Sequence, residues 1–360
     1  MEDEKQGASP EIWVVPIIFA IIFIIGVLGN GTLIAIFLRH RELRNVPNTF
    51  IFTLAIGDLC VCLVCIPFVS TIYTFHSWPY GEMMCKLAEY VNYVSIGVSV
   101  FTLTALSMER YAAIRNPLSL TSLRGNGSGG RGCKIRLLSC LLIWSLALLT
   151  ALPSLIYTQV VEFEGAASNE TIRVCYPYPK ELGLSYSQAM ATYKFLLYYA
   201  LPLGLVSFFY AGMARGLLES TRGIPGEGGG RSQSQMRARK KVAKIVLAFV
   251  IIFAICFLPS HVYFLWWYYT YPRSMDNYNI FWHYFKILGF VLGFCNSCIN
   301  PIAMYVMSDT FRKHFNRYLF CSCRGTSRDL SGLQSQSQDT QVTYRYSVKF
   351  RSGTHPSVQL

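Results

Sequence analysis

Charged residues are scarce in this chain: they make up 14% of its 360 residues, whereas a soluble protein usually carries about 25%. Hydrophobic residues account for 52% of the sequence, and the mean hydropathy is positive. This composition excludes an ordinary soluble domain and indicates that much of the chain lies in a membrane.

Sequence features of several other protein classes are missing as well. The chain has no internal repeat and no pair of matched, interrupted helices of the kind that transporters carry. None of the twelve cysteines has zinc-ligand spacing with histidine, and no nucleophile is paired with a base. Asp58 is the only acid in the middle of an apolar stretch. An enzyme is therefore not expected, and a transporter or channel, which needs a continuous polar path, is disfavoured.

Seven apolar stretches are long enough to cross a bilayer, which takes about 20 residues. They predict an all-α membrane protein: a bundle of seven transmembrane helices over residues 12–307, with a short amphipathic helix at 308–321. Residues 1–11 are expected to form an extracellular N-terminus, and residues 322–360 a disordered cytoplasmic tail. The predicted spans are residues 12–38, 47–75, 84–108, 134–158, 190–214, 242–269 and 280–307.

Lysine and arginine gather in the loops after the first, third and fifth spans. Short basic loops stay on the cytoplasmic side, so we expect the N-terminus outside and the C-terminus inside. The same rule accounts for the net charge of +13, so no nucleic-acid partner is expected. The outer segments lean acidic, which favours a ligand with some positive charge. The opening segment "MEDEKQGASPEIW" is acidic and precedes a long apolar run, so no cleavable signal peptide is predicted.

Two cysteines and one asparagine stand out in the outer loops. Of the twelve cysteines, only Cys85 and Cys175 face an oxidising space in this topology, so they are predicted to form a disulfide with each other. Asn169 begins an outer-loop sequon and is a glycosylation candidate. The sequons at Asn30, within a span, and Asn126, on the cytoplasmic side, are expected to be silent.

The stretch after the seventh span is predicted to lie on the inner leaflet as an amphipathic helix. Phe311, Phe315 and Leu319 share one face of this helix, and basic residues lie on the others. Cys321 and Cys323 follow it and are palmitoylation candidates. Serine and threonine in the tail are potential phosphate acceptors, although a plain solvated tail is the alternative.

Polar residues recur at depths where hydrocarbon disfavours them. A lone buried acid would protonate, whereas one surrounded by Asn and Ser from other helices can stay ionised and hold a cation. Oxygen ligands of this kind suit sodium, so an allosteric sodium ion is possible. The alternative is a polar cluster that only joins helices. The candidate residues are Asp58, Ser99, Asn296, Ser297 and Asn300.

A second ionisable pair, Glu109 and Arg110, follows a long run without formal charge, residues 90–108, at the inner end of the third span. Tyr210 and Tyr305 are expected to reach a similar depth. An arginine held by a neighbouring acid can be released when helices shift and can then offer its donors to a cytoplasmic partner. The alternative is an interface pair that merely snorkels to water.

Several motifs occur in order along these spans and together resemble the rhodopsin-like (class A) G-protein-coupled receptors. The stretches "VSIGVSVFTLTALSMERYAAI" and "NSCINPIAMY…FRKHF" closely resemble the bombesin-like group of peptide receptors, which includes arthropod CCHamide receptors. The stretch "AICFLPSHVYFLWWYY" is most similar to the CCHamide branch. The motifs are "GN" at 29–30, "LAIGDL" at 54–59, Cys85, "ERY" at 109–111, Trp144, Cys175, Pro202, "CFLP" at 256–259 and "NPIAMY" at 300–305.

The resemblance implies a plasma-membrane receptor for an extracellular neuropeptide, coupled to a heterotrimeric G protein of the Gq class. It also implies arrestin and receptor kinases as partners of the tail, with membrane lipids around the spans. A receptor-like protein that signals without a ligand, or that only pairs with other receptors, is the alternative. The implied pocket residues are Glu89, Asn92, Ser95, Phe257, His261, Phe264 and Lys286. The implied switch and coupling residues are Glu109, Arg110, Tyr111, Tyr210, Asn300, Pro301 and Tyr305.

Departures from the family pattern narrow the ligand class. Phe257 stands where most members have Trp, and Trp267 and Phe290 replace arginines that read the ligand in vertebrate bombesin receptors. Asn92 stands where amine receptors carry an acid, and Phe294 where opsins carry the retinal-linking lysine. These differences argue against bombesin itself, an amine and retinal as ligands.

Overall fold

The computed structural model describes residues 10–43, 46–75, 77–115, 131–164, 171–222 and 230–319. The chain divides into two compact units, Met1–Arg312 and Lys313–Leu360, and each is described by itself. Within its described residues, the first unit contains seven helical spans that are long and apolar enough to cross a membrane. The seven predicted spans are therefore confirmed, and the protein is a multi-pass membrane protein.

The helical bounds differ from the predicted spans mainly at the ends. The long helices are α1 (Glu11–Arg39), α2 (Val46–Val64), α5 (Gly81–Arg115), α7 (Arg131–Tyr157), α8 (Gly183–Phe195), α9 (Leu201–Arg222), α10 (Gly230–Tyr269) and α12 (Ile280–Met307). The short elements are η1 (Arg41–Leu43), α3 (Ile66–Val69), α4 (Ile72–Phe75), β1 (Gln159–Glu164), β2 (Thr171–Tyr176), η2 (Lys180–Leu182), the π-helical turn η3 (Leu196–Ala200), α11 (Arg273–Asp276) and α13 (Asp309–Leu319).

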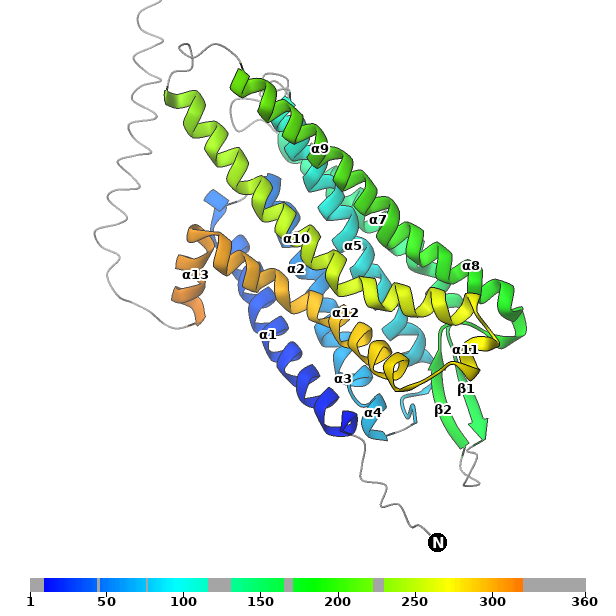
Figure 1. The fold of residues 1–360 in the computed structure, drawn as a ribbon. Coiled ribbons are helices and arrows are strands. Elements are labelled where there is room, and N and C mark those ends of the chain that lie inside the picture. Colours follow the sequence, from blue (N-terminus) through cyan, green and yellow to red (C-terminus); the bar gives the residue numbers. More distant parts are fainter. Residues whose placement is uncertain are drawn as a thin grey trace, which may run out of the picture. The chain divides into compact units, whose positions relative to one another are not determined.

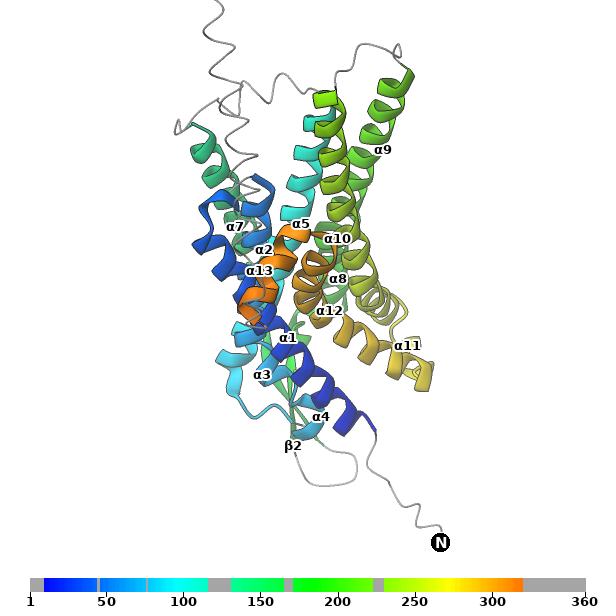
Figure 2. The ribbon, with the colours of Figure 1, turned by 90° about the vertical axis from the view of Figure 1, so that its left-hand side faces the viewer.

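Helix α5 lies at the centre of the bundle, as Figures 1 and 2 show from two sides. It contacts α2, α7, α9 and α10, while α1 packs against both α2 and α12 and so closes the ring. The spans Asn48–Phe75, Gly81–Arg115 and Ile280–Met307 are the most buried of the seven. These three spans also carry the predicted cation site, which therefore lies inside the bundle.

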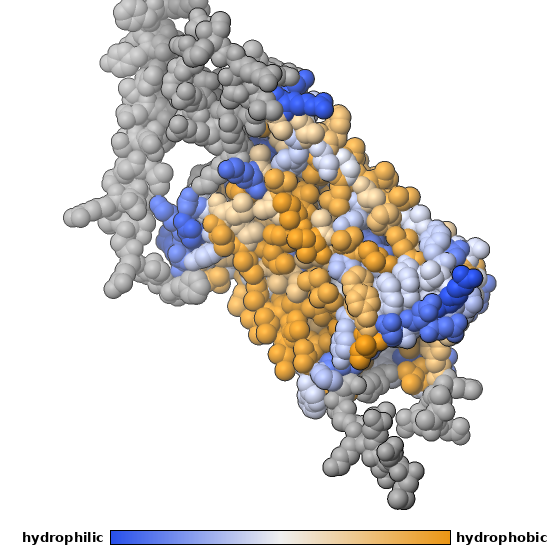
Figure 3. Space-filling view, in the orientation of Figure 1, coloured by the Kyte–Doolittle hydropathy of each residue, from blue (hydrophilic) through white to orange (hydrophobic). Residues whose placement is uncertain are grey.

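The outward faces of the helices are apolar. Along α7, Leu137, Leu138, Leu141, Leu142 and Leu149 are all exposed. Figure 3 shows a broad hydrophobic face along the middle of the bundle, with hydrophilic residues towards the end where α11 lies. An apolar surface of this extent is unfavourable in water and suits contact with lipid chains.

The inner end of the third predicted span and the continuity of the second need correction. Helix α5 continues to Arg115, so Glu109 and Arg110 lie within the helix and not beyond its end. The second span is interrupted at Cys65, where α2 gives way to the short helices α3 and α4. Pro67 follows directly and cannot donate a backbone hydrogen bond, which favours such a break.

A two-stranded sheet, which the all-α prediction did not include, covers one end of the bundle. Strands β1 and β2 pair antiparallel, with Val160 opposite Cys175. The backbone N–H of Trp78 donates to the Arg173 carbonyl at 2.8 Å, and the Arg173 N–H donates to Ser77 Oγ at 3.0 Å. These bonds fasten β2 to the segment between α4 and α5. This end is called the hairpin end below.

Helices α10 and α12 approach closely beside the hairpin end. A Cβ atom at Gly289 would lie 2.8 Å from the backbone nitrogen of Ser260, which is closer than real contacts allow. Glycine therefore permits this crossing. The start of α12 is fixed by Asn279, whose Oδ1 accepts from the N–H groups of Phe281 and Trp282 at 3.1 and 3.2 Å.

A short helix after the seventh span, α13 (Asp309–Leu319), is present as predicted. It crosses the boundary between the two units and ends two residues earlier than the predicted 308–321. Cys321, Cys323 and the tail at 322–360 lie outside the described residues, so the predictions for them stay open.

Candidate functional site

A cavity of about 270 Å³ lies at the hairpin end of the bundle, between α5, α8, α10 and α12. The segment after β2 forms another part of its wall. The lining residues that the sequence had indicated are Glu89, Asn92, Phe257, His261 and Phe264. These residues come from two helices that are distant in the sequence, α5 and α10, and the fold brings them to one space.

Two predicted pocket residues are not among those that line this cavity. Ser95 is buried and lies on the side of α5 that faces α2, where its Oγ would be 3.5 Å from a Cβ atom at Gly57. Lys286 is half-buried on α12, one helical turn before the lining residue Phe290. The helical phase of Ser95 therefore directs it into the helix contact.

The cavity contains a lysine that the sequence reading missed. Lys194, near the end of α8, is 4% exposed, and its Nζ lies 3.3 Å from Glu89 Oε1. The same nitrogen lies 3.8 Å from the ring centroid of Tyr93 and 4.9 Å from that of Tyr178. A signal for it was available, because a charged residue within an apolar span is a functional candidate by default.

Tyr178 closes the cavity from the segment after β2. It is 2% exposed, and its ring packs edge-on against Tyr268 at a centroid distance of 5.0 Å. Burial, and next the charge of Glu89, raise the pKa of the Tyr178 hydroxyl above its ordinary value. Tyr178 therefore stays neutral, and its ring contributes an apolar and π-electron surface to the wall.

Phe257 forms the buried floor of the cavity. Its ring centroid lies 4.6 Å from that of Phe253 on the same helix, and its side chain is 6% exposed. If Gly293 of α12 carried a Cβ atom, the nearest neighbour of that atom would be the Phe257 ring, 3.8 Å away. The ring thus lies at the contact between α10 and α12.

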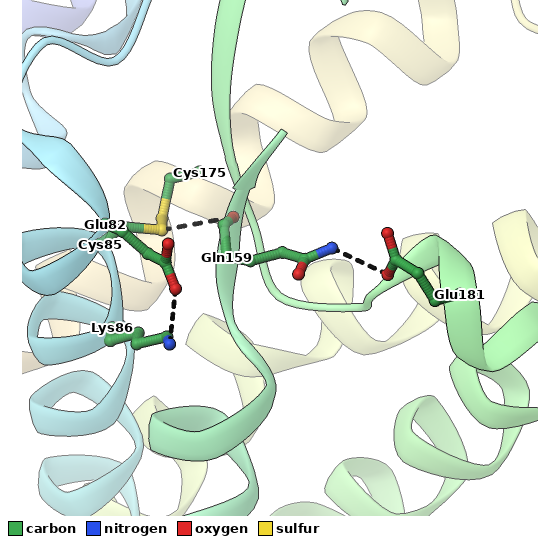
Figure 4. Close-up of polar contacts among 6 residues, drawn as sticks. All are labelled: Glu82, Cys85, Lys86, Gln159, Cys175 and Glu181. Carbon is green, nitrogen blue, oxygen red and sulfur yellow. Dashed lines mark hydrogen bonds and ion pairs between the residues drawn. A yellow bond between two sulfur atoms is a disulfide. The ribbon is translucent and has the colours of Figure 1, made fainter. Parts of the chain in front are cut away.

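The disulfide predicted between Cys85 and Cys175 is present, with an S–S distance of 2.00 Å (Figure 4). It joins the first turns of α5 to β2. The Cys85 sulfur also lies 3.7 Å from the Gln159 carbonyl oxygen of β1. Because both cysteines line the cavity, the bond holds the hairpin over it.

The acidic side chains around the hairpin end are mostly engaged by neighbours. This weakens the expectation of a positively charged ligand, because a paired carboxylate attracts a second cation less strongly. The contacts are Glu82 with Lys86 at 2.6 Å, Glu162 with Arg173 at 3.0 Å, Glu11 with His283 at 3.1 Å and Glu181 with Gln159 at 3.0 Å.

The predicted cation site forms a buried polar centre. The Asn300 amide donates to Asp58 Oδ2 at 2.8 Å, and the Asn30 amide donates to the Ser297 carbonyl at 2.8 Å. Asp58 Oδ1 and Ser99 Oγ are buried without a hydrogen-bond partner among the described residues. Unsatisfied carboxylate and hydroxyl oxygens are ligands that a small hard cation prefers, so these residues fit a sodium ion. Asn296 and Ser297 are also buried, on α12.

At the opposite end of the bundle, Arg110 is 6% exposed and forms an ion pair with the adjacent Glu109. Tyr210 Oη donates to the Ala243 carbonyl of α10 at 2.7 Å. Tyr111 packs on Phe209 of α9, with ring centroids 5.8 Å apart. These contacts join α5, α9 and α10.

Of the remaining switch residues, Pro301 is buried and Tyr305 half-buried on α12. Asn169 lies outside the described residues.

Comparison with known proteins assigns the fold. Residues 29–304 match the family described as 7 transmembrane receptor (rhodopsin family). The chain is 48% identical over 349 residues to the neuropeptide CCHamide-1 receptor of Drosophila melanogaster, covering 96% of this chain and 68% of that protein. It is 37% identical over 312 residues to bombesin receptor subtype-3 of Ovis aries, covering 86% and 75%.

A bombesin receptor of Bombina orientalis is 34% identical over 350 residues, covering 96% of this chain and 86% of that protein. The matched region includes all seven spans, the polar centre and the cavity. The chain therefore belongs to the rhodopsin family of seven-transmembrane receptors, whose members are signalling receptors and not enzymes.

Proposed function

We propose that this protein is a plasma-membrane receptor for a CCHamide-type neuropeptide. The observation that carries the proposal is the 48% identity to a CCHamide-1 receptor across 96% of the chain. The bombesin receptors, at 37% and 34%, are less similar. Trp267 and Phe290, which replace ligand-reading arginines of the bombesin group, support the same choice.

The ligand would enter the cavity from the hairpin end, which is the extracellular end if basic loops remain cytoplasmic. Glu89, Lys194 and His261 provide the polar contacts, and Phe257 and Phe264 the aromatic ones. Both Phe257 and Phe264 belong to α10, so a ligand that presses on them favours a different packing of α10. This placement supports coupling between the cavity and the opposite end.

Arg110, Tyr210 and Tyr305 would respond to that movement. The bond from Tyr210 to Ala243 holds α10 against α9 in the present packing. When α10 moves outward, this bond breaks and Arg110 becomes accessible to a G protein, for which we propose the Gq class. Asp58 and Ser99 would hold a sodium ion, which supplies positive charge to the polar centre.

The remaining partners belong to the segments after the seventh span. Arrestin and receptor kinases are proposed to act on the serine- and threonine-rich tail, and lipid chains to surround the apolar helix faces. Palmitoylation of Cys321 and Cys323 and glycosylation of Asn169 are proposed on the sequence pattern alone.

The test is intracellular calcium in cells that express the full chain, challenged with CCHamide-type and bombesin-type peptides. A nanomolar calcium response to a CCHamide-type peptide supports the ligand class and Gq coupling together. Silence to all of them, with surface expression verified, contradicts the ligand class. High basal signalling under the same silence favours a ligand-independent receptor.

A further inference from the structure

The ion pair between Lys194 and Glu89 is well placed to bind a polar group of a ligand in the cavity. The Lys194 side chain is only 5% exposed, whereas the Glu89 side chain keeps 24% of its surface exposed. Both residues line the cavity. Lys194 reaches Glu89 from α8, and the two rings beside its Nζ come from α5 and from the segment after β2. Its charge is thus balanced before any ligand arrives.

The pair has hydrogen-bonding capacity to spare. An ammonium group has three donors, and a carboxylate has two acceptor oxygens. Among the described residues, the only hydrogen bond of either side chain joins Lys194 Nζ to Glu89 Oε1. The aromatic rings beside Lys194 attract its charge but accept no strong hydrogen bond. A donor and an acceptor therefore remain side by side at the cavity wall.

The charges of the pair decide which ligand group fits. A second carboxylate beside Lys194 would also lie beside Glu89, and a second ammonium beside Glu89 would also lie beside Lys194. Like charges repel strongly where water is excluded. An uncharged group that both donates and accepts, as a carboxamide does, can bond to both residues without adding charge.

Resting on the function proposed above, we propose that Glu89 and Lys194 form the specificity-determining pair of this cavity: they bind an uncharged carboxamide of the ligand and reject a carboxylate in the same place. The carboxamide comes either from a blocked chain end or from an Asn or Gln side chain. The chemistry is shared, and the experiment below separates the two sources.

The experiment measures half-maximal concentrations for pairs of synthetic CCHamide-type peptides. One pair differs only by a terminal carboxamide or a free carboxylate; the others replace each Asn or Gln by Asp or Glu. In the unchanged receptor, the charged peptide of at least one pair is expected to have a half-maximal concentration about tenfold or more above that of its uncharged partner. Glu89→Gln should reduce that ratio of half-maximal concentrations to near one, because the charge of Lys194 is then no longer balanced and attracts the carboxylate.

Two further variants sharpen the result. Lys194→Met should widen the ratio, because Glu89 is left without its cation, and the exchanged pair Glu89→Lys with Lys194→Glu should restore much of it. Glu82→Gln is the matched control, since Glu82 pairs with Lys86 on the same helix and does not line the cavity. The proposal is overturned if no peptide pair has a ratio that depends on Glu89.

A second measurement does not depend on any peptide being the true ligand. Thermal unfolding of the purified full chain is followed with N-acetylphenylalaninamide and with N-acetylphenylalanine. The amide should raise the unfolding temperature more than the acid does, and Glu89→Gln should remove this difference. Equal shifts in the unchanged receptor overturn the specificity pair, whatever the peptide assay gives. Silence in the peptide assay with unequal shifts here contradicts the proposed ligand class alone.

Discussion

The hydroxyl of Tyr210 donates a hydrogen bond to the backbone carbonyl of Ala243, 2.7 Å away, and so joins α9 to α10 at the end remote from the cavity. A similar bond, from Tyr199 to the Ala254 carbonyl at 3.1 Å, joins η3, the turn just before α9, to α10 nearer the cavity. Because the two bonds hold α10 at different depths, at Ala243 and at Ala254, their effects on the helix can be tested separately.

Tyr210→Phe should release the end of α10 that carries Lys244. The lost bond is worth about 1 kcal/mol, or roughly a fivefold shift in population. Distances between spin labels at Arg115 and Lys244 should therefore lengthen without ligand. Tyr199→Phe, the control, should leave this distance unchanged, and equal effects of both changes would contradict the assignment.

Asp58→Asn should reduce the influence of sodium. In the unchanged receptor, replacing sodium by a large organic cation should lower the unfolding temperature and alter agonist affinity. The reason is that the free oxygens of Asp58 and Ser99 would no longer coordinate a cation. In the variant both effects should shrink. Equal salt sensitivity in the two proteins would rule out a cation at this centre. Glu82→Gln, on the exposed surface, serves as the charge-matched control.

Cys175→Ser should abolish ligand binding or surface expression. The disulfide closes a loop with a sequence separation of 90 residues, and loss of such a bond costs about 2–5 kcal/mol. The comparison variant is Cys140→Ser, because Cys140 is a free, half-buried cysteine next to Thr53 Oγ1, and a serine hydroxyl can also donate or accept a hydrogen bond there. Normal binding by Cys175→Ser would show that the hairpin needs no tether.

Gly289→Ala should weaken both stability and ligand binding. The new methyl group meets the Ser260 backbone, which cannot move aside as a flexible side chain would. Helices α10 and α12 must separate, and the cavity between them changes shape. Gly204→Ala is the control, since nothing lies within 4 Å of a Cβ there. That change should be neutral or should raise the free energy of unfolding by about 0.5–1 kcal/mol, seen as a slightly higher unfolding temperature.

The helical spans could be predicted because a bilayer imposes one composition over about 20 residues. The polar centre was predictable for a related reason: Asp58 and Asn300 are costly in hydrocarbon unless they meet each other, and they do, at 2.8 Å. The disulfide followed from the topology, which leaves Cys85 and Cys175 no other partner in an oxidising space.

The cavity could be predicted only in part. Whether a residue at a given depth faces a ligand or a neighbouring helix depends on helical phase, which is why Ser95 turns towards Gly57 on α2. Lys194 pairs with Glu89, which lies 105 positions earlier in the chain, and no local pattern reveals such a partner. The hairpin was missed for a similar reason, because β1 and β2 are six residues each and are held by contacts with Ser77 and Trp78.

The small size of the cavity bears on how a peptide engages this receptor. Sites that enclose whole small molecules usually measure about 300–1,000 Å³, whereas this one measures about 270 Å³. The disulfide fixes Cys175 to α5, and Tyr178 lies in the cavity wall only three residues later. The segment that covers the cavity can therefore move little. Only a few residues of a peptide fit beneath it. For the proposed peptide ligand, we therefore expect the remaining residues to contact the exposed hairpin, so that substitutions there alter affinity more than activation.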